Sequence, residues 1–133
     1  MEQYVTFETA QLLEKRGYDD IDLSTWYVQE GNRVELKRFE HYNLDYYRKK
    51  GDGVYSCPTQ AVVMKWLREE HNIHIELTPI CTGESDEDLE WHYGWAVMTT
   101  IFTYRWRRHD AEHISYEKAC ENAIQYCLEN ILK

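Results

Sequence analysis

One short segment of the chain, residues 57–77, constrains the fold most, because its hydrophobic period changes there from that of a helix to that of a strand. Cys57 and Pro58 predict the start of a helix, with cysteine as the cap and proline in the first turn, where its missing N–H is not needed. In the next turns, apolar residues recur at intervals of three and four. Asn72 predicts the end of the helix, and the residues after it alternate between apolar and polar. The segment therefore predicts a helix followed directly by a half-buried strand.

The N-terminal part of the chain carries two further patterns. Thr6 can cap a helix over residues 7–16, and Gly17 can end that helix in the left-handed conformation. Residues 26–29 and 34–39 flank a short turn that contains a glycine, so they predict a β-hairpin. The sequence therefore begins with a helix and continues with an antiparallel strand pair.

The C-terminal half predicts a strand and a helix. Residues 91–104 form a long aromatic and β-branched run, which an acidic turn at residues 82–88 separates from the preceding strand. Ser115 can cap a last helix with a regular apolar stripe. Residues 40–55 have no clear pattern, and both an irregular excursion and a short strand pair stay open. The element order predicts a single α+β domain over residues 1–133, with an antiparallel sheet of about four to five strands and three helices packed mainly on one face.

The charge of the chain excludes some classes of partner. The formal net charge is −9, and such an acidic protein is disfavoured as a binder of nucleic acids or anionic membranes. No apolar run approaches the length of about 20 residues that spans a bilayer, and the first ten residues lack the pattern of a signal peptide. We therefore expect a cytoplasmic protein without a membrane segment. In that setting the four cysteines are expected to be reduced, with Cys120 and Cys127 acting as small buried hydrophobes.

Residues 57–77, the tyrosines before them and the closing residues 115–133 resemble a family of small proteins encoded by phages and mobile elements of Bacteroidales gut bacteria. The recurring features are a Pro-Thr-Gln helix start, a Lys-Trp-Leu-Arg-Glu core and a following His-Asn-Ile, which stand here at residues 58–60, 65–69 and 71–73. The family has no established activity. The resemblance therefore implies a phage-like setting in the host cytoplasm, and it implies no catalytic residue.

Aromatic and basic side chains between residues 91 and 108 are the candidate binding residues. Large rigid rings on a sheet often anchor a protein partner, because they offer contact area at a small cost in conformational entropy. The candidates are Trp91, Tyr93, Tyr104, Arg105, Trp106, Arg107 and Arg108. The leading hypothesis is a non-enzymatic binding protein that contacts a host or phage protein. A two-fold dimer through an exposed sheet edge or through the Trp91 face also fits the pattern. A nucleotide or small-ligand binder with an aromatic and arginine pocket is the alternative, and no cofactor is implied.

Two groups of histidines are candidate metal ligands. His109, Glu112 and His113 match H-x-x-E-H, in which two histidines one helical turn apart bind zinc and the glutamate acts as a base. The capping Ser115 lies only two residues downstream, so a solvated loop is the expectation and a metal-dependent hydrolase is a third alternative. Histidines 71, 74 and 92 would form a second group if the strands that carry the last two are paired. No metal site is therefore predicted.

Overall fold

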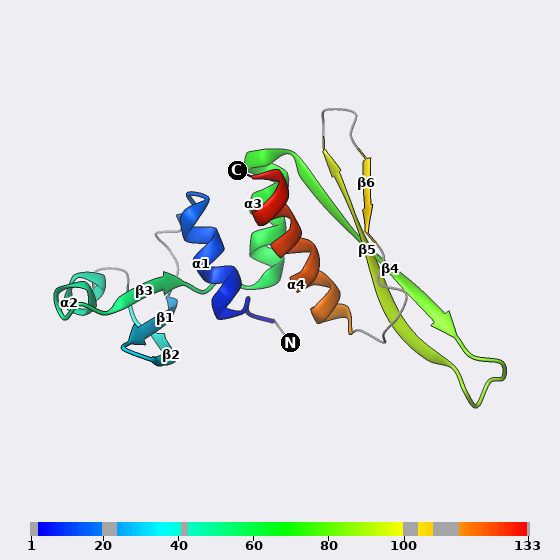
Figure 1. Ribbon diagram of the computed structural model, residues 1–133, viewed down its shortest axis with the longest axis horizontal. Helices are drawn as coiled ribbons and strands as arrows, with labels where there is room; N and C mark the ends of the chain where they lie inside the picture. The colour runs from blue at the N-terminus through cyan, green and yellow to red at the C-terminus, as the bar shows by residue number, and fades with distance from the viewer. Residues whose placement is uncertain (1–2, 20–23, 41–42, 100–103, 108–114, 133) are drawn as a thin grey trace.

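The computed structural model describes residues 3–19, 24–40, 43–99, 104–107 and 115–132, with the backbone alone for residues 104–107. Figure 1 shows three parts side by side: a small sheet with a short helix, a central group of helices, and a long two-stranded ribbon that extends away from the helices. Six strands lie in the described residues, in two antiparallel sheets of three strands. The α+β class expected from the sequence is confirmed, and the strands are divided between two sheets because the helices lie between them.

The small sheet has the strand order β2-β1-β3 and confirms the predicted hairpin. Its strands are β1 (Thr25–Glu30), β2 (Arg33–Arg38) and β3 (Gly53–Ser56), and the short helix α2 (Leu44–Lys49) precedes β3. Residues 40–55, which showed no pattern, therefore contain a helix and a strand. Leu44 and Val54 of this segment pack with Trp26 in a small apolar cluster. Since that cluster needs residues from three separate elements, a local period could not reveal it.

Helix α1 (Phe7–Lys15) follows its sequence signals closely. The Thr6 hydroxyl accepts a hydrogen bond from the Thr9 N–H at 3.3 Å, as a capping side chain should. At the other end Gly17 has φ +83°, and the Tyr18 N–H donates to the Leu13 carbonyl at 3.0 Å. The predicted helix and its glycine stop are confirmed.

Helix α3 (Gln60–His71) begins two residues later than its sequence predicts. Thr59, not Cys57, is the cap, and its hydroxyl accepts from the Val62 N–H at 3.3 Å. The chain around Pro58 is extended because it pairs with the N-terminal segment, and the Val5 N–H donates to the Pro58 carbonyl at 3.0 Å. A hydroxyl also accepts a hydrogen bond better than a thiol does. The predicted stop at Asn72 is confirmed by its left-handed φ of +54°.

The second sheet has the order β4-β5-β6 and contains the ribbon. Its strands are β4 (Ile73–Thr82), β5 (Glu90–Thr99) and β6 (Tyr104–Arg107). The strand after Asn72 therefore runs to Thr82, and the acidic turn between the two ribbon strands is confirmed. Helix α4 (Tyr116–Tyr126), capped by Ser115 as predicted, continues through a wider turn at Cys127–Ile131.

The main core lies where α1, α3 and α4 meet the base of the ribbon. Its buried side chains come from all four elements, among them Leu13, Leu67, Val97, Ile124 and Leu128. Cys120 and Cys127 are buried, and the described cysteines form no disulfide, which confirms their expected packing role. Burial raises the pKa of the Cys127 thiol to about 12, so the neutral thiol is the stable form inside this core.

Candidate functional site

The two ribbon strands present one face to the helices near their base. Residues opposite each other in an antiparallel pair share a face, so the pairs Ile75–Val97 and Leu77–Trp95 lie on the same side. Trp95 lies against Tyr126 of α4, with 5.3 Å between ring centroids. One residue pair further along, the Tyr93 ring meets Tyr116 edge-on at 5.5 Å. Helix α4 therefore covers this face as far as Tyr93.

Beyond Tyr93 the same face continues without a cover among the described residues. Pro79 and Cys81 on β4, and Trp91 on β5, are exposed, and Cys81 is directly opposite Trp91. Trp91 keeps 60% of its surface accessible, and Leu89 keeps 48%. Tryptophan is a costly side chain to leave in water, because burying it removes a large apolar area. The alternating apolar residues of β4 and β5 therefore continue beyond the part of the ribbon that the described helices bury.

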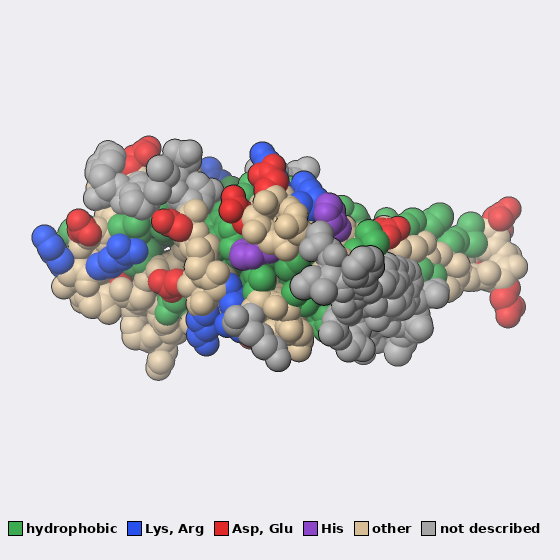
Figure 2. All heavy atoms as spheres, turned by 90° about the horizontal axis from the view of Figure 1, so that it is seen from above, with side chains coloured by type: hydrophobic (Ala, Val, Ile, Leu, Met, Phe, Trp, Pro, Cys, Tyr) green, Lys and Arg blue, Asp and Glu red, His purple; other side chains and the backbone are tan. Residues whose placement is uncertain are grey.

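The turn that joins the ribbon strands is strongly acidic. Five carboxylates and no lysine or arginine occur between residues 84 and 90, and Figure 2 shows acidic side chains at the far end of the ribbon. The turn is held by the Asp88 N–H, which donates to the Ser85 carbonyl at 3.0 Å, and by the Ser85 hydroxyl, which donates to the Asp88 carboxylate at 3.1 Å. We call Pro79, Cys81, residues 84–90 and Trp91 the ribbon end.

Of the candidate binding residues, Trp91 and Tyr93 lie on one face of the ribbon, and only Trp91 belongs to the ribbon end. Tyr104–Arg107 form β6, which pairs with β5 at Trp95–Met98. The nearest of these pairs, Trp95 with Arg107, is four residues from Trp91, or roughly 13 Å along the strand. The side chains of residues 104–107 and the whole of Arg108 lie outside the description, so the basic part of the predicted surface stays a prediction.

The structure tests one of the two predicted histidine groups. His109, Glu112 and His113 lie outside the described residues. The strands that carry His74 and His92 are paired as the second hypothesis required, but His92 is opposite Ile80, six residues from His74 along β4. That register separates the two histidines by roughly 20 Å. Within the described ranges, no group of three histidine, cysteine or acidic side chains is arranged to hold a metal ion.

A buried polar cluster around Glu121 is the main feature that the sequence reasoning missed. Glu121 is only 3% exposed, and its carboxylate accepts from the Thr6 N–H at 3.0 Å and from the Gln60 amide at 2.9 Å. The Thr9 hydroxyl also donates to it, and the Gln125 amide donates to that hydroxyl at 3.0 Å. The signal was present, because Glu121 lies between Cys120 and Ile124 on the apolar face of α4. Its role here is structural: it joins the starts of α1 and α3 to α4.

Neighbouring thiol and phenol groups complete this junction. The Tyr27 hydroxyl donates to the Val5 carbonyl at 2.7 Å, and the Cys57 thiol lies 3.8 Å from the same oxygen. Burial raises the pKa of the Tyr27 phenol and raises the pKa of the Cys57 thiol to about 11. A thiol with such a pKa is a poor nucleophile at neutral pH. The cluster therefore stabilises the junction between the N-terminal segment and the start of α3.

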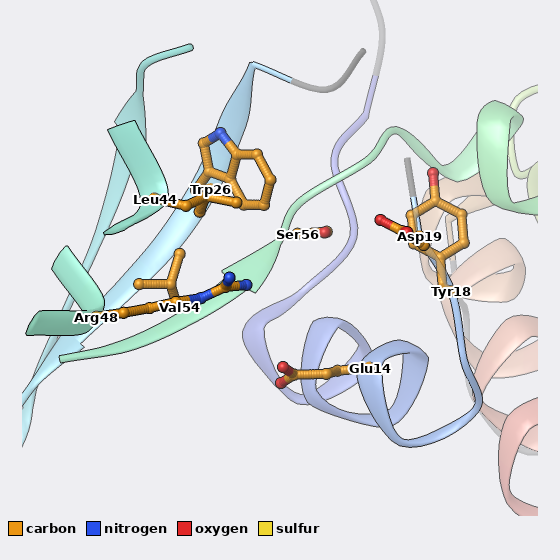
Figure 3. Close-up of a pocket in the computed structure, with 8 residues that line it drawn as sticks. All are labelled: Glu14, Tyr18, Asp19, Trp26, Leu44, Arg48, Val54 and Ser56. Carbon is orange, nitrogen blue, oxygen red and sulfur yellow. The ribbon is translucent and has the colours of Figure 1, made fainter. Parts of the chain in front are cut away.

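One cavity in the described part of the chain combines aromatic side chains with an arginine, although its arginine is Arg48 and the small-ligand hypothesis named Arg105, Arg107 or Arg108. Figure 3 shows Tyr18 and Asp19 on one side of it and Trp26 and Arg48 on the other. Its volume is about 90 Å³, whereas pockets that bury drug-sized ligands measure roughly 300 Å³ or more. A nucleotide does not fit such a space, so the cavity gives the alternative function no support.

Comparisons with known proteins found no match to this chain. No protein-family model, curated protein or solved structure matches the chain. Within the described residues, none of the helices has both the length and the apolar character needed to cross a membrane.

Proposed function

We propose that this protein is a non-enzymatic binding protein that acts by protein–protein contact through the ribbon end. The observation that carries the proposal is the exposure of Trp91 on a strand face that extends past the helices. Exposed aromatic anchors with a charged surround are typical of binding surfaces, since a few desolvated side chains supply most of the binding energy. The ribbon extends away from the helices (Figure 1), and Trp91 is the second residue of β5, next to the turn that joins the two ribbon strands.

The chemistry of the ribbon end describes the partner. Its five carboxylates select a partner with lysine and arginine side chains around the contact, and they speed the encounter at low salt. The exposed indole of Trp91 selects an apolar pocket at the centre of that basic surface. The resemblance of residues 57–77 to phage and mobile-element proteins supports a host or phage protein as this partner, met in the host cytoplasm.

A selection experiment tests the proposal. The full chain is immobilised and used to select ligands from a random peptide library displayed on phage. We expect it to enrich peptides that combine Lys or Arg with a large apolar residue, and their binding should weaken as salt is raised. The substitution Trp91→Ser should reduce their affinity by at least about tenfold, the loss expected for an aromatic anchor.

Tyr46→Ser is the matched control, because Tyr46 is an equally exposed aromatic residue on α2, far from the ribbon end. It should leave peptide affinity unchanged. The proposal fails if no peptide is enriched, or if the enriched peptides bind the Trp91→Ser variant as well as they bind the unmodified chain.

A further inference from the structure

A second exposed apolar surface lies at the opposite end of the molecule, along strand β2. In the described part of the chain no strand lies outside β2, so β2 forms an edge of the small sheet. Val34 is 37% exposed and Leu36 is 49% exposed on this edge. An edge strand with apolar side chains offers its free backbone groups and its apolar surface to another strand. The edge is therefore a candidate for pairing with a second chain.

The apolar surface of the sheet leads directly to this edge. Tyr55, Tyr27 and Leu36 are directly opposite one another on β3, β1 and β2, so they form one row across a single face. The Phe7 ring of α1 packs edge-on against both tyrosines, with centroid distances of 5.4 and 5.6 Å. The row begins under α1 and ends at Leu36, which has no further strand beside it in the described residues. A neighbouring strand with an apolar residue at the same position would continue the row.

The same strand in a second copy supplies that residue in two registers: Leu36 itself, with the axis at Leu36, or Val34, with the axis at Glu35. When two identical strands pair antiparallel about a two-fold axis, one residue must face its own copy. A centre at Glu35 places two glutamates face to face, and a centre at Lys37 places two lysines face to face. Like charges directly opposite each other are destabilising. A centre at Leu36 avoids both pairs.

The Leu36 register also creates favourable pairs on both sides of the axis. It places Glu35 of one copy opposite Lys37 of the other, and it does so twice because of the symmetry. It places Val34 opposite Arg38, whose aliphatic stem can cover the valine. At present Glu35 pairs within its own strand, with the exposed Arg33 and with the partly exposed Lys37 at 3.5 Å. Such surface pairs are weak, so they can be exchanged for pairs across the axis.

The exposed edge of β4 is less suited to this role. β4 carries Pro79 near its middle, and proline has no N–H to donate to a neighbouring strand. Strand β2 contains neither proline nor glycine over its six residues. The difference between the two edges favours β2 as the pairing strand.

We propose that two copies of this chain form a two-fold dimer by pairing their β2 strands, with Leu36 facing its own copy on the axis. The two small sheets then become one six-stranded antiparallel sheet, and the exposed surfaces of Val34 and Leu36 become buried. The two ribbon ends stay free in this dimer, because they lie at the other end of each chain (Figure 1). The inference is independent of the binding function proposed above.

Sedimentation of the full chain over a range of concentrations is the first test. The unmodified chain should show a concentration-dependent dimer. Leu36→Lys places two lysines on the axis, so it should weaken dimerisation by at least about tenfold. Val62→Lys is the matched control, because Val62 is a similarly exposed apolar residue on α3, and it should leave the dimer unchanged. A chain that is monomeric at every concentration overturns the proposal, and so does a dimer that Leu36→Lys does not weaken.

A charge exchange tests the register even if a single variant is poorly folded. Glu35→Lys and Lys37→Glu should each weaken the dimer, because each places like charges opposite one another. The double variant restores opposite charges in the same register, so it should dimerise as the unmodified chain does. Circular dichroism verifies that each variant is folded. If the double variant is folded like the unmodified chain but stays monomeric, the proposed register is wrong.

Cysteine crosslinking locates the axis directly. In a Cys81→Ser background, which removes the exposed native thiol, Leu36→Cys should form an intermolecular disulfide under mild oxidation. Val34→Cys should not, because it faces Arg38 of the second copy. Equal crosslinking at both positions, or at Val34→Cys alone, overturns the proposed axis. Trp91→Ser in the same assay should leave the dimer intact, so a failure of the dimer and a failure of the ribbon-end function are told apart.

Discussion

The carboxylate of Glu121 and the five carboxylates of the ribbon end have the same chemistry in opposite surroundings. Glu121 is buried among Thr6, Thr9 and Gln60, and each of them donates a hydrogen bond to it. The carboxylates at residues 84–90 are exposed. A buried charge is tolerated only where its hydrogen bonds are made, whereas an exposed charge keeps its water. The buried carboxylate therefore determines how the helices meet, whereas the carboxylates of the ribbon end face solvent.

Removing the buried carboxylate is the most damaging change we expect. Glu121→Ala removes the carboxylate that accepts from the Thr6 N–H and the Thr9 hydroxyl, and it leaves the Gln60 amide with the Glu117 carbonyl alone. It should lower the free energy of unfolding by about 3 kcal/mol. Chemical denaturation of the full chain measures this. Glu117→Ala, one turn earlier in the exposed first turn of α4, should change stability by less than about 0.5 kcal/mol. Equal effects of the two substitutions would show that burial does not distinguish these glutamates.

A backbone change at the ribbon end should have the next largest effect. Gly83 has φ +138°, and a Cβ there would lie 2.5 Å from the Asp88 carbonyl oxygen. Gly83→Ala should therefore open the turn, at a local cost of about 2 kcal/mol. Hydrogen exchange of the ribbon amides measures the opening. Gly31→Ala in the β1–β2 turn is the control: a Cβ there meets no atom within 4 Å, so the substitution should cost less, about 1 kcal/mol. Unchanged hydrogen exchange of the ribbon amides in Gly83→Ala would contradict the geometry of the turn.

Alkaline pH distinguishes the buried region from the exposed one through its thiols. Burial raises the pKa of Cys127 from 9.0 to about 12, so the folded state keeps a proton that the unfolded state loses first. The stability from this thiol is complete below the unfolded pKa, and it is lost as pH rises from there towards the folded pKa. Between about pH 8 and about pH 10 the loss should be about 1 kcal/mol. Chemical denaturation of the unmodified chain and of Cys127→Ala at both pH values measures this loss, and the variant should lose less of its free energy of unfolding. Identical losses would show that the Cys127 thiol is not the cause.

Neutralising the exposed carboxylates should have the smallest effect on folding. The combined change Glu84→Gln, Asp86→Asn and Glu87→Gln leaves the Ser85–Asp88 contact in place, and it should alter stability by less than about 0.5 kcal/mol. The same change should slow the association of basic peptides and weaken its salt dependence. Thermal unfolding and stopped-flow binding measure the two parts. A large loss of stability would indicate that these carboxylates support the ribbon, contrary to the comparison.

Local signals in the sequence predicted the helices well and the ribbon end only in part. Thr6, Gly17, Asn72 and Ser115 act where the sequence places them, because caps and stops depend on a few neighbouring backbone groups. The cap at Thr59 was missed because the chain around Pro58 pairs with the distant N-terminal segment. The exposure of Trp91 was also out of reach, since alternation is the same on a covered and an uncovered strand face.

By itself, then, the sequence determined the α+β class, the helix ends, the acidic ribbon turn and the candidate aromatic Trp91. Only the tertiary structure decided that the strands form two sheets, that Glu121 is a buried junction, and that Trp91 lies beyond the helices while Leu36 ends an apolar row at an open edge. The physical reason is the range of the interactions. Period and capping act over a few residues, whereas burial depends on which distant element covers a face.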